Sequence, residues 1–180
     1  MDHVPLYLES AEEPPEGGGW LCGHIPRANP LSEVHVLEDV LAIFHGPECY
    51  ISPSSYPTKA ETGRVVPTWN YQVVHARGRL RVVDDPDWVL EQVSELTRRR
   101  EAGRADPWQV SDAPPEFVAA LVERLVGIEI AVSSWTGKTK ASQNQPLRNR
   151  AGVEAALRRS GSGRDREMAA LVRSLTPSPG

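Results

Sequence analysis

The chain has 180 residues, enough for one domain with a full core or for a domain with a small appendage. It is 39% hydrophobic and 24% charged with a mean hydropathy of −0.40, and no apolar run is long enough to span a bilayer, so we expect a protein without a membrane partner. No leader-like segment opens the sequence, and Cys22 and Cys49 form neither a disulfide framework nor a metal motif, which predicts a reduced, cytoplasmic setting.

Charge is distributed unevenly. The net charge of −4 argues against a general binder of polyanions. Residues 136–180 nevertheless carry nine lysines and arginines against three acidic residues, whereas residues 1–135 carry eleven against twenty-one. The basic C-terminal quarter is compatible with a bound phosphate, with a nucleic acid, with the acidic body of a second copy, or with a solvated helical face.

Hydrophobic periodicity and breaker residues predict the secondary structure. In the first half we expect strands over 3–9 and 20–25 as a hairpin around the loop 12–19, a helix start at Asn29 and Pro30, and short strands over 40–46 and 49–53 separated by Gly46 and Pro47. A polar loop over 52–63 is followed by a long strand over 65–85, with Gly78 as a candidate bulge. The second half is expected to contain helices over 85–100 and 114–126, a strand over 127–135, an irregular segment over 136–146, and helices over 151–159 and 165–175.

The helix boundaries have specific signals. Asp85 is a capping residue and Pro86 suits a first helical position, while Gly127 is expected to end the second long helix. Six or so short strands with two helices between them favour a small β-barrel with helices packed outside it. A parallel sheet of βαβ units is poorly supported, because no glycine-rich nucleotide motif is present.

Two polar clusters precede predicted helices or occupy loops. "GHIPRANP" offers His24, Arg27 and Asn29, and an arginine beside a helix N-terminus can hold a phosphate or simply pair with a nearby carboxylate. "SPSSYPTK" offers hydroxyls and a lysine that suit a phosphate or an ordinary surface loop; these residues are Ser52, Ser54, Ser55, Tyr56 and Lys59.

Two further clusters lie on or beside strands. In "VVPTWNYQVVH", alternation places Trp69, Tyr71 and His75 on one face and Thr68 and Asn70 on the other. Such rings are compatible with a flat ligand or with a core face. "GKTKASQN" is either an anion clamp or a solvated loop; its polar residues are Lys138, Lys140, Ser142, Gln143 and Asn144. The scattered histidines predict no metal site, and hydrolytic chemistry is unsupported.

Taken together, "GHIPRANP", "IFHGPECYISPSSYPTK", "VVPTWNYQVVHARGRLRVVDDPDW" and "GIEIAVSSWTGKTKASQNQP", in this order and spacing, resemble the PaiB family. Its members are described as FMN-binding negative transcriptional regulators with a split β-barrel of the pyridoxamine-phosphate-oxidase type. The resemblance covers nearly all of residues 3–157, and its PTWNY and GKxKxSQN signatures are specific.

The resemblance implies a mainly β fold with α-helices, a split barrel with peripheral helices over 1–148, a helical appendage over 149–175 and a disordered tail over 176–180. It implies a homodimer, with FMN in a cleft between the barrel and the partner subunit, acting as a transcriptional regulator or as a flavin redox protein. The residues assigned to the cofactor are His24, Arg27, Asn29, Ser54, Tyr56, Lys59, Thr68, Trp69, Asn70, Tyr71, His75, Lys138, Lys140, Ser142, Gln143 and Asn144. We expect Arg27, Asn70 and Lys138 to meet around one hollow.

The sequence departs from the family in two ways. It starts in what resembles the middle of a strand, so the usual N-terminal helix and first strand are expected to be absent. Ser55 and Thr139 stand where the family has tryptophan, which would open volume for a larger ligand.

That volume supports an alternative with haem b, because haem-dependent piperazate synthases, which join two nitrogens of N5-hydroxyornithine, are similar in the same motifs. His24 would then be the axial ligand, Arg27 would meet a propionate, and Lys59 or His75 would move protons. A third hypothesis, direct DNA binding, is the weakest, since no helix-turn-helix is legible and most of the chain is acidic.

Overall fold

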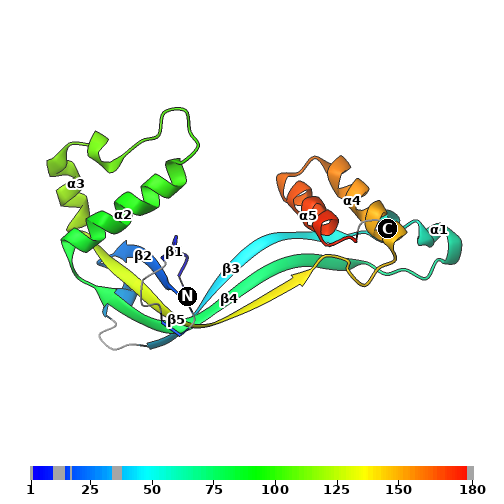
Figure 1. The fold of residues 1–180 in the computed structure, drawn as a ribbon, viewed down its shortest axis with the longest axis horizontal. Helices are drawn as coiled ribbons and strands as arrows, with labels where there is room; N and C mark the ends of the chain where they lie inside the picture. Colours follow the sequence, from blue (N-terminus) through cyan, green and yellow to red (C-terminus); the bar gives the residue numbers. More distant parts are fainter. Residues whose placement is uncertain (1, 10–14, 17, 34–37, 178–180) are drawn as a thin grey trace. The chain divides into compact units, whose positions relative to one another are not determined.

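The computed structural model describes residues 2–9, 15–16, 18–33 and 38–177. Five strands in this part of the chain form one antiparallel sheet with the order β1-β2-β5-β4-β3 (Figure 1). They are β1 (Tyr7–Glu9), β2 (Trp20–Pro26), β3 (Glu38–Ile51), β4 (Thr68–Val83) and β5 (Leu125–Lys140). The predicted class, a mainly β fold with peripheral helices, is confirmed.

The α-helices are α1 (Thr58–Thr62), α2 (Pro86–Glu101), α3 (Pro115–Val122), α4 (Leu147–Ser160) and α5 (Gly163–Ser174). Single 3-10 turns are η1 (Pro30–Glu33), η2 (Pro53–Ser55) and η3 (Val110–Asp112). Among the described residues, none of the helices combines the length and the apolar character needed to cross a membrane. The chain divides into two compact units: unit 1 comprises residues 1–42 and 76–135, and unit 2 comprises residues 43–75 and 136–180.

Unit 1 is built on the pairing of β2 with β5, in which Trp20 lies opposite Ala131 and His24 opposite Gly127. One face of this pair carries buried aliphatic side chains; these are Leu21, Ile25, Val126, Ile128 and Ile130. Helix α2 packs on the other face, where a Cβ on Gly127 would overlap the Trp88 ring. The helix starts as predicted, because the Asp85 carboxylate accepts hydrogen bonds from the backbone N–H groups of Asp87 and Trp88.

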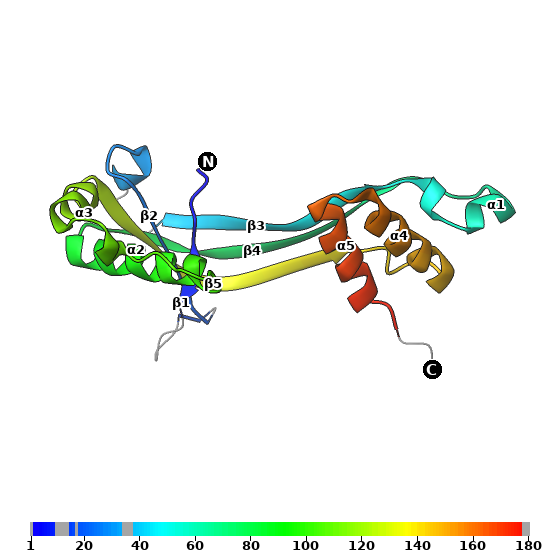
Figure 2. The same ribbon diagram turned by 90° about the horizontal axis from the view of Figure 1, so that it is seen from above.

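Unit 2 has its own core, formed where α4 and α5 cover the end of the sheet. Figures 1 and 2 both show the two helices side by side. Gly161 turns the chain between them at φ 78°, and Ser162 caps α5. The buried residues of this core are Cys49, Ile51, Tyr56, Ala141, Val153, Leu157, Met168, Ala169 and Val172. The helices at 147–174 therefore share a core with β3 and with the residues after β5.

Several predicted boundaries were wrong. The two short strands expected over 40–46 and 49–53 are one strand, β3, which runs through Gly46 and Pro47. Pro47 is tolerated because β3 is the edge of the sheet, and Gly46 is fitted against the Gln72 side chain. The first strand spans Tyr7–Glu9 only; Pro5 and Leu6 instead lie against Gly23.

Further along the chain, Gly127 does not end a helix. Helix α3 stops at Val122 and β5 starts at Leu125, so Gly127 lies inside a strand, buried under Trp88. The segment expected to be irregular after 135 continues β5 to Lys140. The expected loop 52–63 contains η2 and α1. The predicted hairpin of β1 and β2 is confirmed, while the predictions for residues 12–14, 17 and 178–180 lie outside the described residues.

Candidate functional site

Unit 2 exposes aromatic rings and lysines on one face of its sheet. The rings of Tyr50 and Trp69 have centroids 6.4 Å apart at a 55° tilt, and Tyr71 follows Trp69 on the same face of β4. From β5, Lys138 Nζ lies 5.8 Å from the centroid of the Tyr71 ring. Lys140 follows two residues later at the end of β5, where its Nζ donates to Oγ1 of Thr68, the first residue of β4, at 2.5 Å, so Lys140 lies at the edge of this face. We call these residues (Tyr50, Trp69, Tyr71, Lys138 and Lys140) the aromatic–lysine face.

This face is open to solvent. Tyr50 is 54% exposed and Trp69 is 48% exposed, which is unusual for large rings on a strand. Both lysines are exposed, and neither has a carboxylate partner among the described residues. Rings that are not covered and cations that are not neutralised are what a flat anionic ligand requires.

The opposite face of β4 holds a buried polar contact. Asn70 is fully buried and donates from Nδ2 to Ser142 Oγ at 3.0 Å. Ser142 has φ 60°, and Gln143 holds this turn by donating to the Thr139 carbonyl at 2.9 Å and accepting from the Ala141 N–H at 2.7 Å. The Asn70 amide and the Ser142 hydroxyl, both predicted to contact the cofactor, therefore join β4 to the turn after β5.

The polar residues of the motif "SPSSYPTK" also divide into exposed and buried side chains. Lys59 and Ser54 are exposed and joined by a hydrogen bond of 3.1 Å. Tyr56 is only 3% exposed and belongs to the core of unit 2, where burial raises its pKa. Of the remaining predicted residues of unit 2, His75 is half-buried on β4 and Asn144 is exposed.

The polar residues of the motif "GHIPRANP" in unit 1 form hydrogen bonds with other residues of the same chain. Arg27 forms a bidentate pair with Asp84, with distances of 2.7 and 2.8 Å, and also donates to the carbonyls of Glu123 and Leu125. Asn29 accepts from the Leu31 N–H at 2.9 Å and so caps η1. His24 Nδ1 shares a hydrogen bond of 2.7 Å with Gln92 Oε1. These contacts hold unit 1 together, and the expected meeting of Arg27 with Asn70 and Lys138 stays a prediction.

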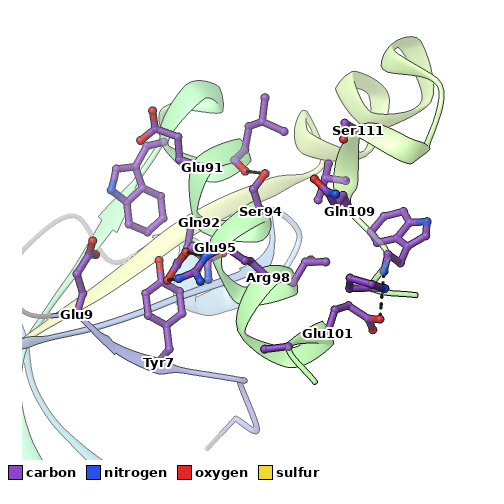
Figure 3. A pocket seen from close by; sticks show the side chains of 17 residues that line it. Tyr7, Glu9, Glu91, Gln92, Ser94, Glu95, Arg98, Glu101, Gln109 and Ser111 are labelled. Atoms are coloured by element: carbon purple, nitrogen blue, oxygen red, sulfur yellow. Dashed lines mark hydrogen bonds and ion pairs between the residues drawn. The ribbon is translucent and has the colours of Figure 1, made fainter. Parts of the chain in front are cut away.

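A groove that sequence reasoning missed lies in unit 1 between β1, α2 and the segment 107–111 (Figure 3). Its volume is about 980 Å³. Its residues come from segments that are distant in the sequence, and only the tryptophans, Trp88 and Trp108, could have drawn attention to it.

Comparisons with known proteins give a family and several relatives. Residues 1–134 match the family model described as "Putative FMN-binding domain". A protein of Emericella nidulans is 32% identical over 95% of this chain and 80% of its own length. The protease synthase and sporulation protein PAI 2 of Bacillus subtilis is 29% identical over 94% of this chain and 78% of its own. The solved flavocytochrome Anf3 of Azotobacter vinelandii aligns with a TM-score of 0.43 at 12% identity, covering 76% of this chain and 54% of that one.

The chain is therefore a flavin-binding protein. It belongs to the PaiB-like family of FMN-binding domains, and FMN is its cofactor. FMN combines a flat ring system with a phosphate group. The aromatic–lysine face offers uncovered rings and two lysines free of acidic partners in the described part of the chain, so the residues present fit the cofactor.

Proposed function

We propose that this chain is a flavin redox protein of the PaiB type that works as a homodimer and holds FMN on the aromatic–lysine face of unit 2. The observation that carries the proposal is the exposure of Trp69 and Tyr50 beside two lysines that lack acidic partners among the described residues. When bound, FMN supplies one- and two-electron transfer. The rings of Trp69 and Tyr71 bind the flavin plane, and Lys138 and Lys140 bind its phosphate.

The residues behind this face position it. Asn70 and Ser142 are buried together, and Gln72 Nε2 donates to Thr139 Oγ1 at 3.2 Å. Each pair joins β4 to β5 or to the turn that follows, and so fixes the separation between the rings of one strand and the lysines of the other. Thr139, which stands where the resemblance to the family predicts tryptophan, thus accepts a hydrogen bond.

A homodimer is supported by apolar side chains that unit 2 leaves open. Val66 is 74% exposed and Leu147 is 54% exposed, in addition to the two uncovered rings. A second copy would remove this apolar area from water and enclose the flavin. Light scattering after gel filtration, run with and without FMN, measures the mass; a monomer under both conditions would contradict this part of the proposal.

FMN binding is tested on the purified full chain. We expect absorption bands at about 370 and about 450 nm, and quenching of flavin fluorescence on titration with FMN. Trp69→Ala and Lys138→Gln should each weaken FMN binding about five- to tenfold, since each removes a stacking or charge-assisted contact. Arg159→Gln, an exposed change on α4, is the matched control and should bind FMN normally.

Two outcomes would overturn the assignment. Unchanged FMN affinity in both Trp69→Ala and Lys138→Gln would mean that the flavin lies elsewhere. An intense Soret band without flavin bands would favour the haem b alternative, in which His24→Ala should lose the haem and Lys59 and His75 become candidates for proton transfer. Neither the family match nor the contact of His24 with Gln92 favours that alternative.

A regulatory role as a negative transcriptional regulator is a second candidate, favoured by the charge of unit 2. Its sequence holds eleven basic and five acidic residues. Arg159, Arg166 and Arg173 are exposed on α4 and α5 and have no carboxylate partner in the described part of the chain. If these helices bind duplex DNA, fluorescence anisotropy should show an affinity that falls steeply between 50 and 200 mM salt. Weak binding that does not change with salt would exclude nucleic acid as a partner.

A further inference from the structure

The groove of unit 1 has two walls, each fixed to α2 by a polar contact. On one side, Arg99 Nη1 donates to the Leu8 carbonyl at 2.9 Å, and its guanidinium lies 4.3 Å from the centroid of the Tyr7 ring, which ties β1 to the helix. On the other side, Glu101 accepts a hydrogen bond of 3.3 Å from the Trp108 N–H. The groove of about 980 Å³ is therefore held open by specific contacts and is large enough for a small molecule.

The carboxylates in the groove differ in how they are neutralised. Glu95 accepts hydrogen bonds from Arg98 and Arg99, which lower its pKa to about 2, and Glu101 pairs with Arg104 at 3.1 Å. Glu91 has no ion pair among the described residues, and the contact of Glu9 is with the neutral Cys22 thiol at 3.3 Å.

These two uncompensated carboxylates also lie close to one end of the groove. In Figure 3, Glu9 and Glu91 are at that end, whereas Glu101, Gln109 and Ser111 are toward the other. Arg98, the cation in the lining, is already occupied by Glu95. The end with Glu9 and Glu91 is thus suited to a positive charge, since Arg99, which lies beside Tyr7, is already engaged by Glu95 and the Leu8 carbonyl.

The rest of the lining suits an aromatic body. Trp88 and Trp108 both line the groove, and Trp108 is 47% exposed. Gln92 also lines the groove, but its amide is buried and its Oε1 is bonded to His24, so it belongs to the wall of the groove. A ring of a ligand would remove the open part of Trp108 from water.

We propose that this groove binds a small organic amine with an aromatic body. Its ammonium group lies at the end with Glu9 and Glu91, and its ring lies against the tryptophans. The charge is assigned to carboxylates without ion pairs in the described part of the chain, and the ring to the exposed part of Trp108. The site lies entirely in unit 1 and uses none of the residues of the aromatic–lysine face.

Three probes of the same shape but different charge test the proposal by isothermal titration calorimetry on the flavin-loaded full chain. They are tyramine, tyrosol and 4-hydroxyphenylacetate, which end in an ammonium, a hydroxyl and a carboxylate. We expect saturable binding of tyramine with a Kd of about 1 mM or lower, weaker binding of tyrosol, and no binding of the acid. Equal binding of the three, a preference for the acid, or no saturation with tyramine would each overturn the proposal.

Variants locate the site. Glu91→Gln should weaken tyramine binding about three- to fivefold, and Trp108→Ala about fivefold. Glu116→Gln changes an exposed acid of α3 outside the groove and should leave tyramine affinity unchanged. Thermal unfolding of each variant confirms that it is folded. If Glu116→Gln weakens tyramine as much as Glu91→Gln does, the binding is a general effect of charge and the proposed site is wrong.

Discussion

The two units differ in how many of their cations are paired with carboxylates. Unit 1 has nine basic and nineteen acidic residues, and five of its nine arginines form ion pairs in the described part, among them Arg27 with Asp84 and Arg81 with Glu129. Unit 2 has eleven basic and five acidic residues, and only three of its cations are paired in the described part, while both lysines of the aromatic–lysine face are not.

This difference separates structural from ligand-binding residues better than residue type does. Arg27 and Lys138 are both cations in motifs that resemble the family. Arg27 forms a bidentate ion pair with Asp84, whereas Lys138 lies beside the Tyr71 ring and has no carboxylate partner in the described part of the chain. The same criterion applied to acids selects Glu91 over Glu95 in the groove of unit 1. The predictions below test this criterion and the difference in packing between the units.

The largest expected effect concerns how tightly unit 1 is packed. Gly127→Ala places a methyl group inside the ring of Trp88, so α2 would have to move from the sheet. We expect a loss of up to about 3 kcal/mol in the free energy of unfolding, measured by urea denaturation. Gly137→Ala, on the part of β5 in unit 2 where a Cβ meets nothing within 4 Å, is the control and should change stability little. Equal losses would show that the two ends of β5 are packed alike.

The next effect compares two neighbouring residues of β4. Asn70→Ala leaves the buried Ser142 hydroxyl without its partner and should cost about 2 kcal/mol of unfolding free energy. Trp69→Ala removes an exposed ring and should leave stability nearly unchanged while weakening FMN binding. Urea denaturation of the apoprotein, paired with FMN titration, measures both. If Trp69→Ala proves the more destabilising of the two, the ring is structural and the assignment of the faces is wrong.

The contrast between the exposed Trp69 and the buried Asn70 was partly predictable from the sequence of β4. Strand alternation alone separated Trp69 and Tyr71 from Asn70, because side-chain direction in a strand follows from position. What alternation could not predict is which face is buried, since that depends on α4 and α5, whose side chains come from residues 147–174. The sequence reasoning therefore grouped Asn70 and Ser142 with the ligand residues, although they are buried against each other.

Contacts between distant segments account for the other differences. Arg27 looked available because Asp84 is 57 residues away, and nothing local reveals that pair. Gly127 looked like a helix terminator because glycine often has that role, but here it provides room for Trp88. The groove escaped notice because β1 is distant in the sequence from α2 and the segment 107–111, and only the fold brings these elements together.

A smaller effect tests the structural assignment of Arg27. Arg27→Gln breaks an exposed bidentate pair, so we expect only a slight decrease in Tm. If the pair is structural, FMN affinity should change less than about twofold, in contrast to Lys138→Gln. Asp84→Asn, which removes the other partner, should give the same small decrease in Tm. A clear loss of FMN affinity in Arg27→Gln alone would place Arg27 in the cofactor site and break the distinction between the units.

The smallest expected effect is a pH dependence in the groove of unit 1. Hydrogen bonds from Arg98 and Arg99 lower the pKa of Glu95 from 4.5 to about 2. A lowered pKa means that the folded state favours the ionised form, so this contribution to stability is complete above about pH 4.5 and is lost as the pH falls toward 2. The Tm difference between wild type and Glu95→Gln should therefore be present at pH 6 and shrink steadily below pH 4.5. It should also be reduced by 0.5 M NaCl, because the carboxylate is partly exposed.

Glu91→Gln is the control, since Glu91 is on the same helix but has no ion pair in the described residues. Its Tm difference from wild type should not shrink below pH 4.5. If it does shrink, Glu91 has a cationic partner and is not the uncompensated carboxylate that the amine site requires.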